Sequence, residues 1–578
     1  MQNPAVRSIA LWLLAAGCLP YAASQSTVGT VTLTQAAPKG VAIMGSNPHP
    51  SYTSIASPVE KPDYDLVRAR RLSIANLPDS TQVPTPSALS VPAPWPNPIV
   101  SHAPNVAFAG LSTVDNANAN GNVVTPPDQG LCAGHGYVME AINSTLAVYS
   151  EKGAQLTTPE SVNGFFGADP ATTFLSDPRC YYDAPTQRWF LSMTNVLNFV
   201  TGRSNLFLAV SQTSDPAGAY SIYSIDTTDD GLDGTPANSG CTTASPCFGD
   251  QPTLGADFNG VYLTTNEFGV FSGNFNGAQV YALSKTLLES GATLALVHIG
   301  NLPLAEGIAY SIQPASSPDL RSNEDSGVEY FLSALDFTGT LDNRVAVWAL
   351  NNTRSLAQPT PTVSLMNVIL TSEVYGQPAP VVQKPGPFPL GQSLGEPEEM
   401  IDSGDDRMQN VVFADGQLWG GLDTIVSNGK SINSGIAYFV VIPEISDNGL
   451  RARVLGQSYI SVAGNSAIYP GIGVTSDGTA AAAFTVAGPT TFPSAAYASL
   501  NPFRAGPINI VAAGAAPQDD FSGYKAFGGG GVARWGDYSW GVADGNSLWL
   551  ATEYIPGGIN SVDFFTDFGT YVYSVNQD

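Results

Sequence analysis

Acidic and basic side chains recur at intervals along this chain of 578 residues, each close to a proline or a glycine. Such a set could hold a cation through oxygen ligands or clamp a carboxylate through arginine. Asp before Pro or Gly can equally cap a turn and tie neighbouring loops together, which is a structural role. The residues that we expect to share one ligand-binding site are Asp128, Asp177, Arg179, Asp250, Gln313, Asp406, Arg407, Arg534, Asp537 and Tyr538.

These polar positions belong to a repeated pattern. A short, mostly apolar segment follows each one and leads into a Gly- or Asp-containing turn and an aromatic-rich strand. Seven copies occur, with turns near residues 134, 183, 257, 325, 415, 477 and 544. A repeat of this length with alternating apolar residues is typical of one small antiparallel sheet. We therefore predict an all-β fold, a seven-bladed β-propeller over residues 106–578, with six and eight blades as alternatives.

A closed ring of blades would bring all the polar positions to one mouth of a central channel. The ring needs a closing contact between its ends. We expect the last strand, near 569–575, to complete its blade with a strand from about 105–112. The interpretation of the site depends on this closure.

The region before the repeats has a different composition. Residues 1–24 begin with a basic residue, continue with a short apolar core and end with small residues, a pattern that predicts an export signal. Lipid attachment at Cys18 is the alternative. Residues 25–105 include a proline-rich run at 84–98 that is incompatible with a helix or a central strand. We expect an extended linker or pro-segment there, and a secreted or periplasmic protein.

The net charge of the chain limits the classes of partner that it can bind. The chain carries 48 acidic and 22 basic residues, for a net charge of −26. Phosphate backbones would be repelled, which excludes nucleic acid as a partner. A glycan or an extracellular protein remains, and we expect a monomer. No segment after the signal is long and apolar enough to predict a transmembrane helix.

Four cysteines remain once the signal is removed, and an even number in an exported chain predicts disulfides. Cys241 and Cys247 flank five residues and would staple one loop. Cys132 and Cys180 then pair by elimination. A metal site is the alternative, but no His/Cys cluster supports it.

One insert is strongly acidic and could bind Ca²⁺ through carboxylate oxygens. It lacks the residue order of an EF-hand loop, so a solvated loop is the other interpretation. The acidic residues concerned are Asp226, Asp229, Asp230 and Asp233.

Several strings in the repeats resemble secreted bacterial β-propeller proteins of unassigned function. The most specific strings are Ser-Asp-Pro-Arg at 176–179, with Tyr-Asp at 182–183 and Arg-Trp at 188–189, and Arg-Trp-Gly-Asp-Tyr-Ser at 534–539. The resemblance covers about residues 110–578 and implies the propeller fold and export. Cys132 and Cys180 replace aliphatic residues of that group, which favours their pairing. The resemblance transfers no catalytic residue.

Composition and motifs favour a binding module, and whether the protein is an enzyme stays open. The alternative is a glycan-active hydrolase or lyase of sialidase-like architecture, which needs three Arg, a Tyr nucleophile with a Glu partner, and an Asp acid. The Ser-x-Asp-x-Gly-x-Thr-Trp boxes of sialidases are missing. Candidates for those roles are Arg179, Arg407, Arg534, Tyr538, Glu267 and Asp128.

Overall fold

A computed structural model describes residues 22–23, 28–45, 59–60, 89–198, 200–238, 240–304, 307–318, 327–427, 431–557 and 567–576. Strands dominate these residues, and the longest helix, α2 (Thr113–Asn120), has 8 residues. The fold is all-β, as predicted. Among the described residues, no helix is long and apolar enough to cross a membrane.

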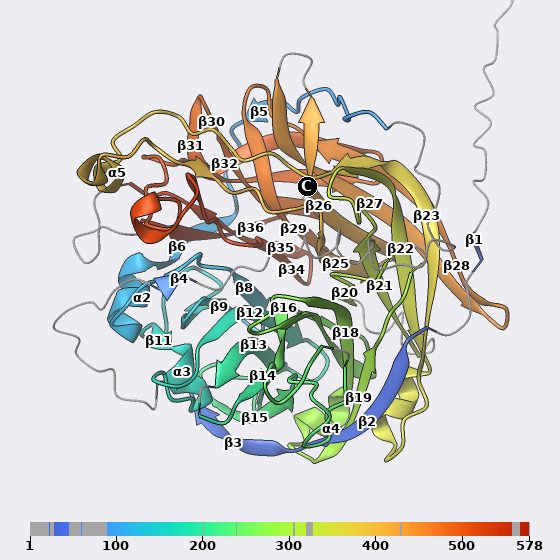
Figure 1. Cartoon of the computed structure of the whole chain (residues 1–578). Helices are drawn as coiled ribbons and strands as arrows, with labels where there is room; N and C mark the ends of the chain where they lie inside the picture. The colour runs from blue at the N-terminus through green and yellow to red at the C-terminus, as the bar shows by residue number, and fades with distance from the viewer. Residues whose placement is uncertain are drawn as a thin grey trace, which may run out of the picture.

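The main strands form seven antiparallel groups, numbered here along the chain (Figure 1). Group 1 contains β8 (Gly130–Gly134), β9 (Tyr137–Ile142), β10 (Thr145–Ser150) and β11 (Glu160–Ser161), and group 2 contains β12 (Leu175–Asp183), β13 (Arg188–Asn198), β14 (Arg203–Ser211) and β15 (Ala219–Asp226). Group 3 contains β16 (Cys247–Ala256), β17 (Gly260–Gly269), β18 (Phe275–Ser284) and β19 (Leu294–Gly300). Group 4 contains β20 (Gln313–Ser316), β21 (Val328–Ala334), β22 (Leu341–Asn351) and β23 (Ser364–Gly376).

Groups 5 to 7 continue the same order. Group 5 contains β25 (Met408–Ala414), β26 (Gln417–Ser427), β27 (Ile432–Ser446) and β28 (Gly449–Ile460). Group 6 contains β29 (Ser466–Val474), β30 (Ala480–Gly488), β31 (Thr491–Asn501) and β32 (Arg504–Ala512). Group 7 contains β34 (Trp540–Asp544), β35 (Ser547–Tyr554), β36 (Gly569–Val575) and β6 (Val106–Ser112).

The first strands of successive groups contact one another. The contacts run from β8 to β12, β16, β20, β25, β29 and β34, and β34 contacts β8 again. Two of them include parallel bridges, Ala256 with Ser316 and Ala315 with Val411, so groups 3, 4 and 5 count as one large sheet. Figure 1 shows the first strands near the centre and the later strands outside them.

The expected turns join the first two strands of each group. The turn near residue 415 links β25 to β26, and Gly416 supplies a left-handed φ of 69° there. The turns near 134, 183, 257, 477 and 544 occupy the equivalent place in their groups. The copy at Asp325 lies outside the described residues.

Segments from before the repeats complete several groups. The predicted pairing of the last strand is confirmed, because β36 pairs with β6 from Gly569 opposite Ser112 to Ser574 opposite Val106. Within the stretch expected to be a linker, β2 (Thr30–Ala36) pairs with β19 and β3 (Pro38–Ile43) pairs with β15. The described parts of this stretch thus include edge strands. Most of the expected signal, residues 1–21, lies outside the described residues.

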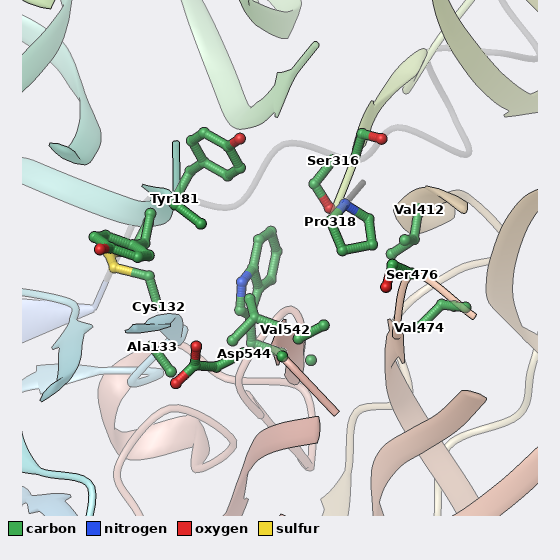
Figure 2. Close-up of a pocket in the computed structure, with 18 of the residues that line it drawn as sticks. Cys132, Ala133, Tyr181, Ser316, Pro318, Val412, Val474, Ser476, Val542 and Asp544 are labelled. Carbon is green, nitrogen blue, oxygen red and sulfur yellow. A yellow bond between two sulfur atoms is a disulfide. The ribbon is translucent and has the colours of Figure 1, made fainter. Parts of the chain in front are cut away.

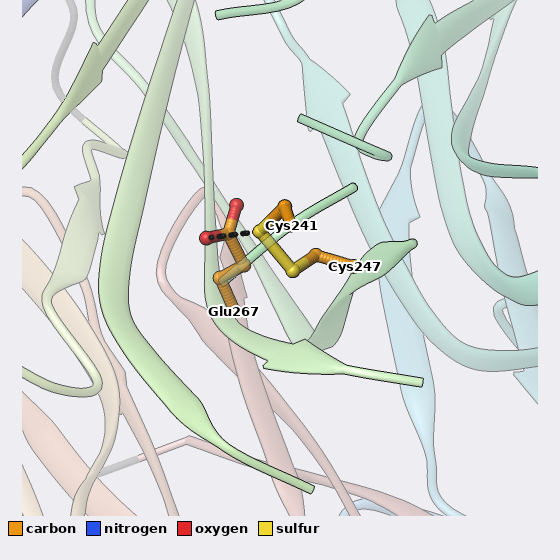
Figure 3. Close-up of side chains that lie close together, drawn as sticks. All are labelled: Cys241, Cys247 and Glu267. Atoms are coloured by element: carbon orange, nitrogen blue, oxygen red, sulfur yellow. Dashed lines mark hydrogen bonds between the residues drawn. A yellow bond between two sulfur atoms is a disulfide. The ribbon is translucent and has the colours of Figure 1, made fainter. Parts of the chain in front are cut away.

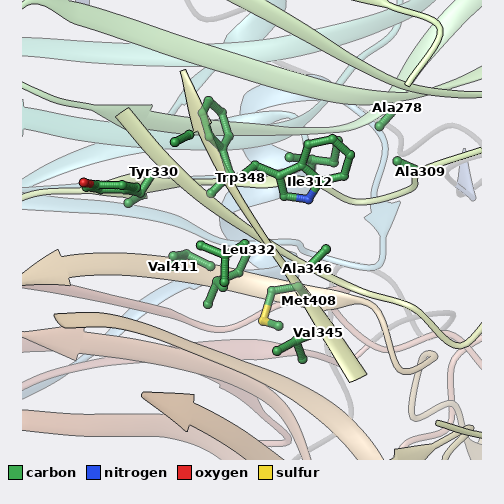
Figure 4. Packing of buried hydrophobic residues seen from close by; sticks show 14 of the residues in the cluster. Ala278, Ala309, Ile312, Tyr330, Leu332, Val345, Ala346, Trp348, Met408 and Val411 are labelled. Atoms are coloured by element: carbon green, nitrogen blue, oxygen red, sulfur yellow. The ribbon is translucent and has the colours of Figure 1, made fainter. Parts of the chain in front are cut away.

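The largest apolar cluster fixes groups 3, 4 and 5 against one another (Figure 4). Ile312, Leu332, Trp348 and Met408 are all fully buried in it. The indole Nε1 of Trp348 donates to Ser333 Oγ at 3.0 Å, so its one polar atom is satisfied. Close packing of this kind holds the first strands at fixed positions, which the polar residues at their starts require.

Candidate functional site

The polar positions lie where the first strands begin, and several of these strands are bulged there. The pairing register shifts within the first hairpins of groups 2, 3, 5 and 6. Three of the shifts contain a residue with left-handed φ directly before a proline: Asp177 at 59°, Gln251 at 46° and Tyr469 at 57°. A bulge redirects a side chain and interrupts the ladder, so these polar–proline steps are shared backbone features.

Asp128 connects group 7 to group 1. Its Oδ1 accepts a hydrogen bond from the amide of Asp537 at 2.6 Å, and its Oδ2 accepts one from Asn143 Nδ2 at 2.8 Å. Asn143 Oδ1 in turn accepts from the amide of Asp177 in group 2 at 2.8 Å. Asp128, Asn143 and Asp177 are fully buried. This chain of hydrogen bonds joins three groups.

Arg179 continues the connection from group 2 to group 3. Its Nε donates to the Pro252 carbonyl at 2.6 Å, and its guanidinium carbon lies 3.2 Å from the ring centroid of Tyr538. The Tyr538 hydroxyl donates to the Pro178 carbonyl at 3.2 Å. Burial lowers the pKa of Arg179, and the nearby acidic groups, including Asp177, offset part of that effect.

Arg407 reaches from group 5 to group 3. Asp405 binds it bidentately, with Nε to Oδ1 at 2.7 Å and Nη2 to Oδ2 at 2.9 Å, and Nη1 donates to Gln251 Oε1. Burial acts to lower the pKa of Arg407, but Asp405, then Asp537 and Asp250, raise it above its ordinary value. Acidic residues of groups 3, 5 and 7 therefore act on one guanidinium.

Asp537 also contacts Arg534, whose Nη2 lies 3.2 Å from Asp537 Oδ1. The side chains of Asp537 and Arg407 are 21% and 16% exposed, whereas Asp128 is inaccessible. The predicted site residues thus divide into buried residues that connect groups and partly exposed residues near the starts of the first strands. Gln313 begins β20 opposite Leu332. Asp406 is fully buried, and it adds to the effect of burial, Asp342 and Tyr310 in raising the pKa of Tyr375.

Sequence reasoning missed a second set of buried carboxyl groups beside this site. Glu553 of β35 accepts from the amide of Gly536 at 2.7 Å, and burial, followed by Asp520, Asp128 and Asp567, raises its pKa well above the ordinary value. Burial and Asp520 raise the pKa of Glu399 to about 11. The adjacent acids at 398–399 and at 519–520 were local signals, but Glu553 carries none.

The acidic insert considered for Ca²⁺ surrounds an arginine. Arg203 lies 2.9 Å from Asp230 and 3.6 Å from Asp226, and it also contacts Asp233. Asp229 instead points inward, with Oδ2 3.8 Å from His298 Nε2. A guanidinium therefore already neutralises part of this insert.

Among the described residues, one group of possible metal ligands has its donor atoms close together: Cys241, Cys247 and Glu267 (Figure 3). The two sulfur atoms form the predicted disulfide, and Glu267 Oε1 lies 3.4 Å from Cys241 Sγ. A disulfide sulfur is not a thiolate, so this group does not fit a metal site. The second predicted disulfide, Cys132 with Cys180, is also confirmed and joins β8 to β12.

A cavity of about 120 Å³ lies toward the other ends of the first strands (Figure 2). Tyr182 and Asp544 supply polar atoms to it, and the Cys132–Cys180 disulfide lines it. Every group contributes to its wall, through Cys132, Tyr181, Leu254, Ser316, Val412, Val474 and Val542.

No family model and no curated protein matches the chain. Solved structures similar to it include a protein of unknown function from Dyadobacter fermentans DSM 18053, with 11% identity, a TM-score of 0.29, and coverage of 70% of this chain and 96% of that one. An endo-1,5-α-L-arabinanase from Thermotoga petrophila RKU-1 has 10% identity, a TM-score of 0.25 and coverage of 78% and 98%. The exo-β-1,3-galactanase 1,3Gal43A from Clostridium thermocellum has 11% identity, a TM-score of 0.27 and coverage of 82% and 100%. TM-scores of this size carry no argument about function.

Proposed function

We propose that the seven groups are the blades of a closed β-propeller and that the protein is an exported binding module, akin to the secreted bacterial propellers that its sequence resembles. Contacts from β8 through every first strand and back to β8 support closure. The cavity with residues from all seven groups in its wall supports a central channel. Two disulfides suit an oxidising compartment outside the cytoplasm.

The ligand site that we propose is the mouth where the first strands begin. The observation that carries it is the partly exposed pair of opposite charges from different blades, Arg407 at 16% and Asp537 at 21%. Asp537 is close enough to raise the pKa of Arg407, and the nearby Asp250 adds a further acceptor. A positively charged hydrogen-bond donor beside negatively charged acceptors suits a hydroxyl-bearing ligand such as a glycan, or the surface of an extracellular protein.

The buried members of the set have a different role in this proposal. Asp128, Arg179 and Tyr538 bond to backbone groups of neighbouring blades and hold the mouth in shape. Their substitution should reduce stability before it changes ligand preference, because each would leave a buried partner unsatisfied.

Glycan hydrolysis is the second candidate. A two-carboxylate mechanism needs one protonated and one ionised carboxyl group. Glu553 has a raised pKa, with Asp128 among the charges that act on it, which fits half of that requirement. Glu553 and Asp128 are buried and bonded to backbone amides, which is why we rank binding first.

A glycan array comparing wild type with Arg407→Met and Arg344→Met would test the binding role. Arg344 is the matched control, because Asp342 binds it in the same bidentate way, at 3.1 and 2.7 Å. Binding should be lost in Arg407→Met and kept in Arg344→Met. Equal loss in both variants, or no glycan bound by wild type, would contradict glycan binding at this mouth. Release of reducing sugar by wild type but not by folded Glu553→Gln would establish the hydrolase instead.

A further inference from the structure

The cavity of about 120 Å³ that all seven groups line has a buried end and an open end (Figure 2). Trp540 lines the buried end and is 8% exposed. Asp544, four residues farther along β34, lies at the turn into β35 and is partly exposed. Ala184 and Ser476, at the equivalent turns of groups 2 and 6, are exposed lining residues. The cavity therefore opens toward these turns, at the opposite end of the first strands from the ligand site proposed above.

The wall between the two ends is apolar. Leu254, Val412 and Val474 come from the first strands of groups 3, 5 and 6, and each is at most 4% exposed. Cys132 and Cys180 add sulfur atoms that are joined in a disulfide. A polar group of a ligand would lose its water here without gaining hydrogen bonds, so the part of a ligand that enters this region must be apolar.

Asp544 is the one residue with a charged side chain among the described residues of the lining. Its carboxylate makes no hydrogen bond and no ion pair with the residues that the structure describes. Burial, followed by Glu151, raises the pKa of Asp544, and His135 acts to lower it. A partly exposed carboxylate in a cavity wall, with no cationic side chain bound to it, can accept hydrogen bonds from a cation that enters from solution.

Further carboxylates lie at the same end of the first strands. Asp415 and Asp477 occupy the equivalent turns of groups 5 and 6, and both are exposed. A Cβ placed on Gly478 of the group 6 turn would lie 3.7 Å from Asp415 Oδ2, so the two turns adjoin. The net charge of the whole chain is −26. The field at the open end therefore attracts cations and repels anions.

Three basic residues near the cavity already have partners. Arg188 Nη1 donates to two carbonyls of its own turn, at 3.0 and 3.2 Å. Lys285 Nζ lies 2.7 Å from Asp183 Oδ1. At the buried end, the guanidinium carbon of Arg179 lies 5.0 Å from the ring centroid of Trp540, so a second positive charge is repelled from that end. A cationic ligand would keep its charge at the open end and its apolar part inside.

The dimensions of the cavity limit the length of such a ligand. At about 10–15 Å³ for each water-sized position, a volume of about 120 Å³ holds about eight to twelve non-hydrogen atoms. The strand rises about 13 Å over the four residues from Trp540 to Asp544. A linear chain of about six to eight carbon atoms meets both limits.

We propose that this cavity binds a linear aliphatic monoammonium ion. The ammonium group donates to the Asp544 carboxylate, and the Tyr182 hydroxyl at the same end accepts a further hydrogen bond. The alkyl chain lies among Leu254, Val412 and Val474. The site uses none of the residues proposed to bind a ligand at the starts of the first strands.

Isothermal titration calorimetry of the full chain at pH 7 would test the ligand class. The probes are hexylamine, hexanol, hexanoate and hexamethylenediamine. Hexylamine is protonated at this pH and should bind more tightly than the other three. Hexanol lacks the charge, hexanoate reverses it, and hexamethylenediamine would place a second charge in the apolar region. Failure of hexylamine to bind, or equal affinity for hexylamine and hexanol, would overturn the proposal.

Asp544→Asn is the informative variant, because it removes the charge and keeps the shape of a side chain that makes no hydrogen bond within the described protein. It should keep the wild-type Tm and leave the affinity for hexanol unchanged. Hexylamine should bind about five- to tenfold more weakly, which is less than for a fully buried charged pair because Asp544 is partly exposed.

Asp415→Asn is the matched control, because Asp415 occupies the equivalent turn of group 5 and lies outside the lining. Hexylamine affinity should stay within about twofold of wild type in this variant and in Arg407→Met. Val542→Phe should fill the cavity and abolish binding of hexylamine, with the fold checked by its Tm. Equal weakening in Asp544→Asn and Asp415→Asn, unchanged binding in folded Val542→Phe, or loss of binding in Arg407→Met would overturn the proposed position of the site.

Discussion

Glu140 connects group 1 to two strands of group 7. It is a fully buried residue of β9 in group 1, and its Oε2 accepts from the amide of Leu111 in β6 at 2.9 Å. Its Oε1 accepts from the Thr570 hydroxyl of β36 at 2.6 Å. Both β6 and β36 belong to group 7, so the charge state of this carboxyl should affect how strongly group 1 and group 7 are held together.

Burial raises the pKa of Glu140 from its ordinary 4.5 to about 7, even though its hydrogen bonds with Thr570 and Leu111 act to lower it. Between these two pH values, the folded protein binds more protons at this site than the unfolded chain does. The free energy of unfolding should therefore fall as pH rises from 4.5 to 7. At 1.36 kcal/mol per pKa unit, the total is about 3 kcal/mol.

Glu140→Gln removes this titration at nearly constant volume. The amide oxygen can still accept from Leu111, and the amide nitrogen can donate to the Thr570 hydroxyl. The hydroxyl hydrogen, no longer needed by residue 140, can then donate to the Leu111 carbonyl, which lies 2.9 Å from Thr570 Oγ1. The variant should match wild type within about 1 kcal/mol at pH 4.5 and exceed it by about 3 kcal/mol at pH 8, by the same pKa arithmetic. Urea denaturation at a series of pH values measures the difference.

The matched control is Glu151→Gln, at an exposed turn position, which should change stability by less than about 0.5 kcal/mol throughout. The reasoning would be refuted by a Glu140→Gln difference that does not vary with pH, or by wild type being the more stable protein at pH 8.

Three further changes test the packing and connections between groups. Asn143→Ala should cost about 3 kcal/mol in urea denaturation, because it removes the bonds to Asp128 and to the Asp177 amide in a buried site; a cost near zero would deny that they connect the groups. Cys132→Ser with Cys180→Ser opens a link between residues 48 positions apart and should cost about 2–5 kcal/mol; a Tm equal to that of wild type would contradict this. Trp348→Ala should cost at least about 3–5 kcal/mol, because it empties the packed space between groups 3, 4 and 5, and a smaller loss would mean that the site collapses around the cavity.

Local signals in the sequence were sufficient to predict the positions of strands and hairpins. Gly and Asp at residues 415–416 define a turn through backbone conformation alone, so the position of the β25–β26 hairpin could be predicted from two residues. The disulfide between Cys241 and Cys247 was equally local. The pairing of β36 with β6 followed from the need of a repeat array to close.

Contacts between distant residues could not be specified in the same way. The amide of Asp537 meets Asp128 across 409 positions, and the sequence does not indicate that the bond is to the backbone. Arg203 lies within the acidic insert because β14 and β15 are paired, which turns a possible cation loop into an ion-pair cluster. The strand β2 was assigned to an extended linker because of the proline-rich run at 84–98, although Thr-Val-Thr-Leu-Thr at 30–34 alternates as a strand does.

The central claim is that the starts of the first strands meet around one channel mouth, and a crystal structure of the full chain tests it most directly. The account predicts electron density that joins Arg407 to both Asp405 and Gln251, and that places the Asp537 amide on Asp128. Density in which groups 7 and 1 are separated, or in which Arg407 and Asp537 lie on opposite sides of the molecule, would contradict it.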